Sequence, residues 1–318
     1  MSDLVQDKSA SRASDCPACP GKPVLERIAA RQAEIGKGFV VRRAVPNKAR
    51  RMVGAWCFLD HAGPVDHGPG EGLRVGPHPH IGLQTFTWMI EGQALHRDSL
   101  GFEQMIRPGQ VNLMTAGRGI AHSEESPADE AGRIHAAQLW IALPDSERHR
   151  EPSFHHYPDL PVIKRGNFTI TVLAGEALGK TAPAKIFSPL VGLDLTSAAA
   201  ASTQLPLEPS FEHAIMCLRG KVVVEGETVE PGELLYLGMQ RTTIDIHCNA
   251  ETQVLLVGGE PFAEDILVWW NFVARTPEEI RTATENWNAG REFGEVPNTP
   301  LAPLKAPDLT GLSLKAKR

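Results

Sequence analysis

Short apolar runs separated by glycine and proline fill the chain from Phe39 to Gly259. These runs are about as long as β-strands, and many are rich in β-branched or aromatic residues. Examples are QTFTWMI, QVNLMT, FTITVLAG, HAIMCLRG and TQVLLVGG. Short strands at regular spacing, with turn residues between them, are typical of β-sandwiches and β-barrels. The sequence therefore predicts an all-β fold.

A weak internal repeat suggests that this fold is present twice. TWMIEGQALHRD with IRPGQVNLMTAG resembles IMCLRGKVVVEG with VEPGELLYLG, and each copy reads as strand, glycine turn, strand, Pro-Gly turn and strand. Two copies predict two similar β-domains, divided in the proline-rich stretch 144–161. We expect a tail and helix over 1–37, a first barrel over 38–150, a second over 151–275, and a helix and tail over 276–318.

Two helices are expected outside the strands. The first spans 23–35 and ends at Gly36. The second begins at TPEE, where Thr276 is the N-cap, the proline takes the first helical position and Glu279 completes a capping box. Ile280, Ala283 and Trp287 form its apolar stripe, which is the pattern of a helix packed on one face.

Composition and charge exclude some classes of protein. The net charge of −6 argues against direct binding to nucleic acid. The first residues contain no apolar segment typical of a signal peptide, and no apolar run is long enough to cross a membrane. Five cysteines are too few for a disulfide scaffold. We therefore expect a soluble cytoplasmic protein with reduced thiols.

Two histidine motifs point to a metal site. In GPHPHIGLQ, His78 and His80 are two residues apart between prolines that favour extended backbone, and in TAGRGIAHSEESP the same spacing separates His122 and Glu124. Alternate residues of a strand lie on one face, so neighbouring strands would bring three imidazoles and a carboxylate together. This donor set suits Fe(II), Mn(II), Ni(II), Cu(II) or Zn(II). Four protein ligands leave one or two coordination positions of a five- or six-coordinate metal open for a substrate.

The order HxH, hairpin, PG and GxxH resembles the cupin pattern. The longer string HPHIGLQTFTWMIEGQALHRDSLGFEQMIRPGQVNLMTAGRGIAHSEE is similar to the pirin family, as are VVRRAVPNKARRMVGAWCFLDHAGP upstream and ILVWWNFVARTPEEI downstream. This resemblance implies two cupin (jelly-roll) barrels in tandem. It implies one metal ion, iron, in the N-terminal barrel, with ligands His78, His80, His122 and Glu124.

The chain departs from the family pattern at two positions. Gln84 stands where many cupins have a glutamate ligand, and we expect it on the His78/His80 face beside the metal. Ile81 stands where pirins often have arginine, which changes the charge near the pocket mouth. The second barrel has His213 but no HxH pair, so we expect it to bind no metal.

Other residues are assigned to the pocket or to the surface. Phe86, Trp88 and Met114 would give a dry pocket for a flat aromatic ligand. Gln138 is either a polar group in that pocket or a structural amide. The HRD triplet at 96–98 is expected at a polar hairpin edge, with the alternative that its histidine lies near the pocket. The CPAC motif at 16–19 is expected in a flexible tail, with a redox or metal site as the alternative.

The resemblance implies a quercetin 2,3-dioxygenase, which opens a flavonol ring with O₂ while Glu124 acts as general base. The alternative is a non-enzymatic, iron-dependent redox sensor that binds a transcription factor or metabolic enzyme as its protein partner. A third interpretation is another cupin chemistry on the same metal. The basic stretch 42–51 could dock such a partner, although a solvated strand edge is the preferred interpretation. A dioxygenase needs an apolar cavity beside the metal, whereas a regulator could have a closed site.

Overall fold

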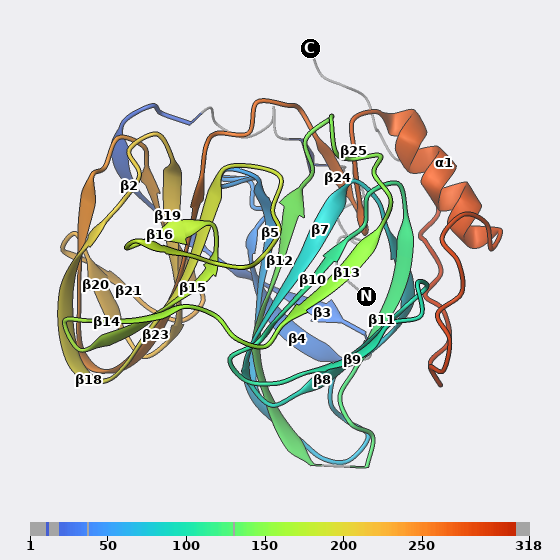
Figure 1. Cartoon of the computed structure of the whole chain (residues 1–318), viewed down its shortest axis with the longest axis horizontal. Helices are drawn as coiled ribbons and strands as arrows, with labels where there is room; N and C mark the ends of the chain where they lie inside the picture. Colours follow the sequence, from blue (N-terminus) through green and yellow to red (C-terminus); the bar gives the residue numbers. More distant parts are fainter. Residues whose placement is uncertain (1–10, 13–18, 37, 130, 310–318) are drawn as a thin grey trace.

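The computed structural model describes residues 11–12, 19–36, 38–129 and 131–309. Two β-barrels lie side by side, joined along one flank of each (Figure 1). The prediction of a mainly β fold with two barrels in tandem is confirmed. Within the described ranges, no helix is long and apolar enough to cross a membrane.

The first barrel combines two antiparallel sheets. In spatial order, the larger sheet contains β13 (Ser153–Tyr157), β10 (Val111–Thr115), β7 (Leu83–Glu91), β12 (Gly132–Ala142), β5 (Trp56–His67), β4 (Phe39–Val45) and β3 (Arg31–Ile35). The smaller sheet contains β6 (Arg74–His80), β11 (Ile120–Glu125), β8 (Ala94–Asp98) and β9 (Glu103–Ile106). Because β13 pairs with β10, residues 153–157 belong to the first barrel, beyond the expected boundary at 150.

The second barrel is built mainly from one long sheet. Its order is β14 (Val162–Arg165), β15 (Phe168–Ala174), β18 (Leu190–Pro206), β23 (Thr243–Gly259), β19 (Glu212–Arg219), β22 (Glu233–Gly238) and β2 (Pro23–Ala29). Two short hairpins complete it, β20 (Val222–Val224) with β21 (Glu227–Val229), and β16 (Glu176–Ala177) with β17 (Lys180–Thr181).

The expected helix over 23–35 is wrong, because this segment forms β2 and β3. Along β2 the side chains alternate in exposure until Ile28 is buried, which is the period of a strand. Pairing of β2 with β22, reinforced by the ion pair of Arg27 with Glu233, outweighs the helix propensity of the sequence. The N-terminal segment thus supplies one strand to each barrel.

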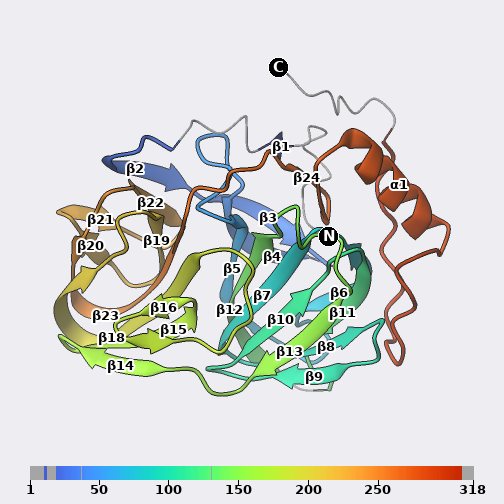
Figure 2. The same ribbon diagram turned by 45° about the horizontal axis from the view of Figure 1, so that its top comes forward.

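The C-terminal helix is confirmed as α1 (Pro277–Asn288). The Thr276 side chain caps it by accepting the Glu279 N–H, and Ile280 and Ala283 are buried. Before it, β24 (Leu267–Trp269) and β25 (Phe272–Ala274) form a small sheet with β1 (Ser11–Arg12). Figure 2 shows α1 beside the first barrel, where it packs on β25, which in turn lies against β6. The chain after the second barrel therefore returns to cover the first.

An apolar core joins the two barrels. It includes Trp56, Phe86 and Trp88 from the first barrel and Met216 and Tyr236 from the second. The buried Trp88 indole donates to the Asp194 carboxylate across the interface, at 3.2 Å. This shared core holds the barrels together as one unit.

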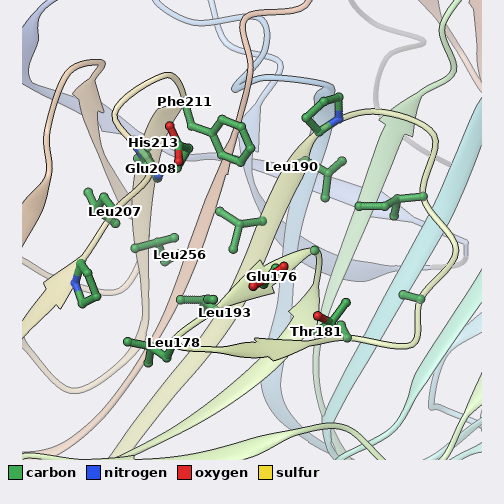
Figure 3. Close-up of a pocket in the computed structure, with 18 of the residues that line it drawn as sticks. Glu176, Leu178, Thr181, Leu190, Leu193, Leu207, Glu208, Phe211, His213 and Leu256 are labelled. Carbon is green, nitrogen blue, oxygen red and sulfur yellow. The ribbon is translucent and has the colours of Figure 1, made fainter.

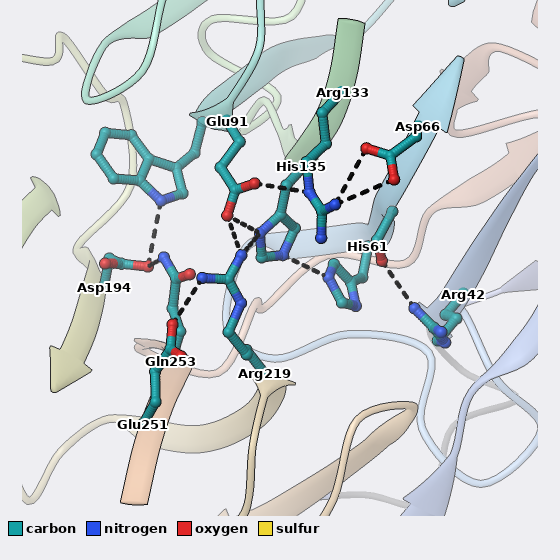
Figure 4. Close-up of polar contacts among 12 residues, drawn as sticks. Arg42, His61, Asp66, Glu91, Arg133, His135, Asp194, Arg219, Glu251 and Gln253 are labelled. Atoms are coloured by element: carbon teal, nitrogen blue, oxygen red, sulfur yellow. Dashed lines mark hydrogen bonds and ion pairs between the residues drawn. The ribbon is translucent and has the colours of Figure 1, made fainter. Parts of the chain in front are cut away.

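A polar cluster lies beside this core (Figure 4). The Nε2 atoms of His61 and His135 are 2.9 Å apart, and Arg219 of the second barrel pairs with Glu91 of the first. Burial is the largest cause that lowers the pKa of His61 to about 3 and that of His135 to about 4. Both imidazoles are therefore neutral near pH 7.

Candidate metal centre

Strands β6 and β11 bring the two histidine motifs together. They pair antiparallel, with His122 opposite His78 and Ile120 opposite His80, so the predicted neighbourhood of the two strands is confirmed. The Nε2 atoms of His80 and His122 are 3.1 Å apart. One ring nitrogen from each of the three histidines lies within 4.8 Å of the other two.

Backbone carbonyls fix two of the imidazoles. Nδ1 of His78 lies 2.9 Å from the Gly76 carbonyl, and Nδ1 of His80 lies 2.9 Å from that of Asn271. A carbonyl only accepts hydrogen bonds, so each Nδ1 carries the hydrogen. In a neutral imidazole the other nitrogen, Nε2, then has a free lone pair, as a metal ligand requires.

The third imidazole is fixed through a second histidine. His122 Nδ1 lies 3.3 Å from His96 Nδ1, and His96 Nε2 lies 3.0 Å from the Asp98 carboxylate. Asp98 accepts from His96 Nε2, so His96 Nδ1 accepts from His122 Nδ1. His122 is thereby held as the tautomer that presents Nε2 to the other two histidines.

Burial keeps all three imidazoles neutral. Loss of hydration lowers the pKa of His78 to about 4. Burial and the neighbouring imidazoles lower the pKa of His80 and His122 well below the usual range. A neutral imidazole can ligate a metal ion, whereas a protonated one cannot.

Glu124 lies on the wall of the same cavity but outside the tight group of three histidines. The pairing of β11 with β6 shifts register between His122 and Glu124. The pairing of β11 with β8 continues through both residues without a shift, so the extra residue is in β6. Alternation along β11 therefore keeps Glu124 on the same face as His122, as predicted. Burial raises the pKa of Glu124 to about 7.

A small cavity of about 70 Å³ adjoins the histidines. Phe58 and Trp140 stack on one wall, with ring centroids 4.0 Å apart. The guanidinium of Arg43 lies over Phe58 and makes a bidentate pair with Asp60, at 2.7 and 2.6 Å. The remaining lining is mainly apolar: Ile35, Val41, Ala62, Val75 and Leu304, with Gln138 and Asn271.

Of the five predicted pocket residues, the structure places only Gln138 on this cavity, where its Oε1 accepts from Thr87 at 2.7 Å. Gln84 instead donates to the Thr115 hydroxyl and the Lys185 carbonyl. The chain turns at Gly82 into another sheet, so the face set by His80 does not continue to Gln84. Phe86 and Trp88 pack in the core between the barrels, and Met114 packs in a separate core cluster.

Three contributors to the site lie outside the preferred sequence predictions. His96 is buried against His122, so the preferred position at a polar hairpin edge is wrong and the alternative near the pocket is confirmed. Its spacing from Asp98 is the same two residues that marked the other motifs, and this signal could have identified it. Asn271 and Leu304 reach the site from the distant C-terminal segment, for which no local pattern exists.

Two other sequence candidates do not form sites as expected. Arg43 and Arg50 of the basic stretch are buried, at 0% and 3% exposure, so they do not form a solvated strand edge or a docking face. Cys19 contacts the Tyr236 hydroxyl at 3.1 Å, and burial raises the pKa of its thiol, which disfavours a reactive thiolate. Cys16 lies outside the described residues.

Two barrels, one of them bearing a buried histidine cluster, define the chain as a bicupin. Residues 38–141 match the Pirin family and residues 192–294 match the Pirin C-terminal cupin domain, so the chain belongs to the pirin family. The predicted family is thus confirmed.

Similar proteins agree with this assignment. The chain is 50% identical to "Putative quercetin 2,3-dioxygenase" of Pseudomonas aeruginosa, over 97% of this chain and 98% of that protein. A "Pirin-like protein" of Caulobacter vibrioides is 37% identical, over 82% and 92%. The crystal structure titled quercetin 2,3-dioxygenase from Acinetobacter baumannii is 51% identical with a TM-score of 0.87, over 89% of this chain and 95% of that one.

Proposed function

We propose that the protein is a metal-dependent dioxygenase of the quercetin 2,3-dioxygenase type, acting on a flavonol in the cytoplasm. The observation that carries this proposal is the convergence of three neutral imidazoles whose Nδ1 atoms are all engaged. The names of the relatives at 50% and 51% identity support the choice of reaction.

The donor set fits an iron(II) ion. His78, His80 and His122 would hold it, with Glu124 as the fourth ligand, and Mn, Ni, Cu or Zn would accept the same donors. When bound, the metal would acidify the flavonol hydroxyl and support its reaction with O₂. Overall, O₂ is consumed, the flavonol ring opens, and carbon monoxide and a depside are released.

The chain's own residues would position the substrate and move one proton. Glu124 would accept the proton of the flavonol 3-hydroxyl, because it lines the cavity and burial raises its pKa to about 7, which suits a general base. The other acid of the lining, Asp60, is paired with Arg43. The stacked rings of Phe58 and Trp140 offer an apolar surface for a flat aromatic ring and exclude water from it. Thr87 fixes the amide of Gln138 at the same wall.

The small cavity favours a second candidate, an iron-dependent regulator that binds a protein partner. A volume of about 70 Å³ holds two or three waters, whereas sites for drug-sized ligands measure about 300–1,000 Å³. Leu304 lines the cavity, and its N–H donates to the Pro77 carbonyl while its carbonyl accepts from the Trp287 indole. A flavonol would enter only after this segment moves.

A turnover assay tests the proposal. The protein is loaded with Fe(II) without oxygen, mixed with quercetin and exposed to O₂, while quercetin absorbance and carbon monoxide are followed. The proposal predicts turnover that His80→Ala abolishes and that His155→Ala, an exposed histidine of β13, leaves intact. Absence of turnover with iron fully bound contradicts the dioxygenase and directs the search to a protein partner.

A further inference from the structure

The second barrel contains a pocket ten times larger than the metal cavity. Its volume is about 710 Å³, within the range of small-molecule sites. It lies between the β16–β17 hairpin and the segment 206–211 that leads into β19. Its floor includes Leu193 and Leu256, which belong to the apolar core of this barrel.

The internal sequence repeat relates one residue of this pocket to the metal site. In the internal repeat, TWMIEG begins at Thr87 and IMCLRG begins at Ile215. Counting back seven residues from each gives His80 in the first barrel and Glu208 in the second. A carboxylate thus stands where the first barrel has a metal-site histidine.

Three side chains form a recognition group on one side of the pocket. Figure 3 shows Glu208, His213 and Phe211 together, with Glu176 and Thr181 on the opposite side. His213 is buried, at 1% exposure, and its ring lies near the Phe211 backbone. Neither ring nitrogen reaches ordinary hydrogen-bond geometry with that backbone or with another described residue. A buried imidazole that is so weakly satisfied gains from a ligand that pairs with it.

The charges of the lining determine which ligand suits it. Burial lowers the pKa of His213 to about 4, so the ring is neutral and offers a lone pair. Hydrogen bonds from Ser210 lower the pKa of Glu208, which is therefore ionised. Among the described residues that line the pocket, the charged side chains are Glu176 and Glu208, and no lysine or arginine is present. The pocket attracts cations and repels anions.

We propose that this pocket binds a small amphipathic amine. Its ammonium group donates hydrogen bonds to Glu208 and His213, and Phe211 adds a cation–π contact. Its apolar body lies on Leu193 and Leu256. This site is separate from the metal centre, and the proposal does not depend on the dioxygenase activity.

Three probes that share a phenylethyl or phenylmethyl body but differ in charge test the proposal. Binding of phenethylamine, 2-phenylethanol and phenylacetate to the full chain is measured by calorimetry at pH 7. We expect phenethylamine to bind at least about tenfold more tightly than the alcohol, and phenylacetate to bind most weakly. Phenethylamine that binds no more tightly than phenylacetate overturns the proposal, as does the absence of binding by any probe.

Variants locate the binding. Glu208→Gln should weaken phenethylamine about tenfold and leave 2-phenylethanol unchanged, and because Glu208 is exposed the fold tolerates the change. Glu151→Gln, an exposed acid of the first barrel, is the matched control and should change nothing. Thr181→Trp, at the exposed rim, should block all three probes. Unchanged affinity for phenethylamine in both Glu208→Gln and Thr181→Trp refutes this site.

Discussion

His96 connects the metal centre to Asp98, and its replacement should weaken metal binding without removing a ligand. In His96→Leu the His122 Nδ1–H loses its acceptor at 3.3 Å, and Asp98 loses a donor at 3.0 Å. His122 is then free to rotate or to adopt the other tautomer. Loss of such a supporting contact typically costs about 10–100-fold in metal affinity. This corresponds to about 1.4–2.7 kcal/mol.

The assay is a titration with Fe(II) against a competing chelator under anaerobic conditions. His96→Gln should recover much of the affinity, because the amide oxygen can accept from His122 while the amide N–H donates to Asp98. His156→Leu, on β13, removes a hydrogen bond to Asn112 of β10 outside the site and serves as the matched control. A folded His96→Leu protein with wild-type iron affinity would refute the role assigned to His96.

Three further predictions concern pH, the buried ion pair and the segment that contains Leu304. The folded-state pKa of His61 lies below its unfolded value of 6.5, so its stabilising contribution is present above pH 6.5 and is lost as the pH falls toward 3. Between pH 7 and pH 4 the wild-type protein should therefore lose about 3 kcal/mol more unfolding free energy than His61→Gln, as measured by urea denaturation. An equal loss in the two proteins would contradict this. Arg43→Met leaves a buried carboxylate unpaired and should destabilise the fold by about 3–5 kcal/mol. Arg118→Met removes an exposed pair and should change the stability little in the same denaturation assay. Equal effects of the two substitutions would be inconsistent with the burial of the Arg43 pair. Leu304→Ala opens the cavity and should raise kcat/KM for quercetin, and a value at or below that of the wild type would show that this side chain does not limit entry.

The histidine cluster could be predicted from sequence because its signals are local. Two residues of spacing put His78 and His80 on one strand face, and the second motif lies on the paired strand. The same rule failed for Gln84, where the chain has passed into another sheet. Strand alternation predicts a shared face only while the strand continues without interruption.

Contacts between distant segments could not be predicted from local patterns. The Asn271 carbonyl that fixes His80 is 191 residues away along the chain, and Leu304 lines the cavity from beyond the last helix. The segment 23–35 contains good helix formers, and its sequence therefore predicts a helix. It forms two strands instead, because it pairs with one strand in each barrel. Tertiary pairing decided the outcome in each case.

X-ray absorption spectroscopy of the Fe(II)-loaded protein shows whether a mononuclear metal centre forms on the three histidines. We expect one iron per chain with three imidazole ligands, falling to two in His80→Ala, and loss of an oxygen ligand in Glu124→Ala. Iron that binds with no imidazole scattering, or with the same spectrum in wild type and His80→Ala, would contradict this expectation.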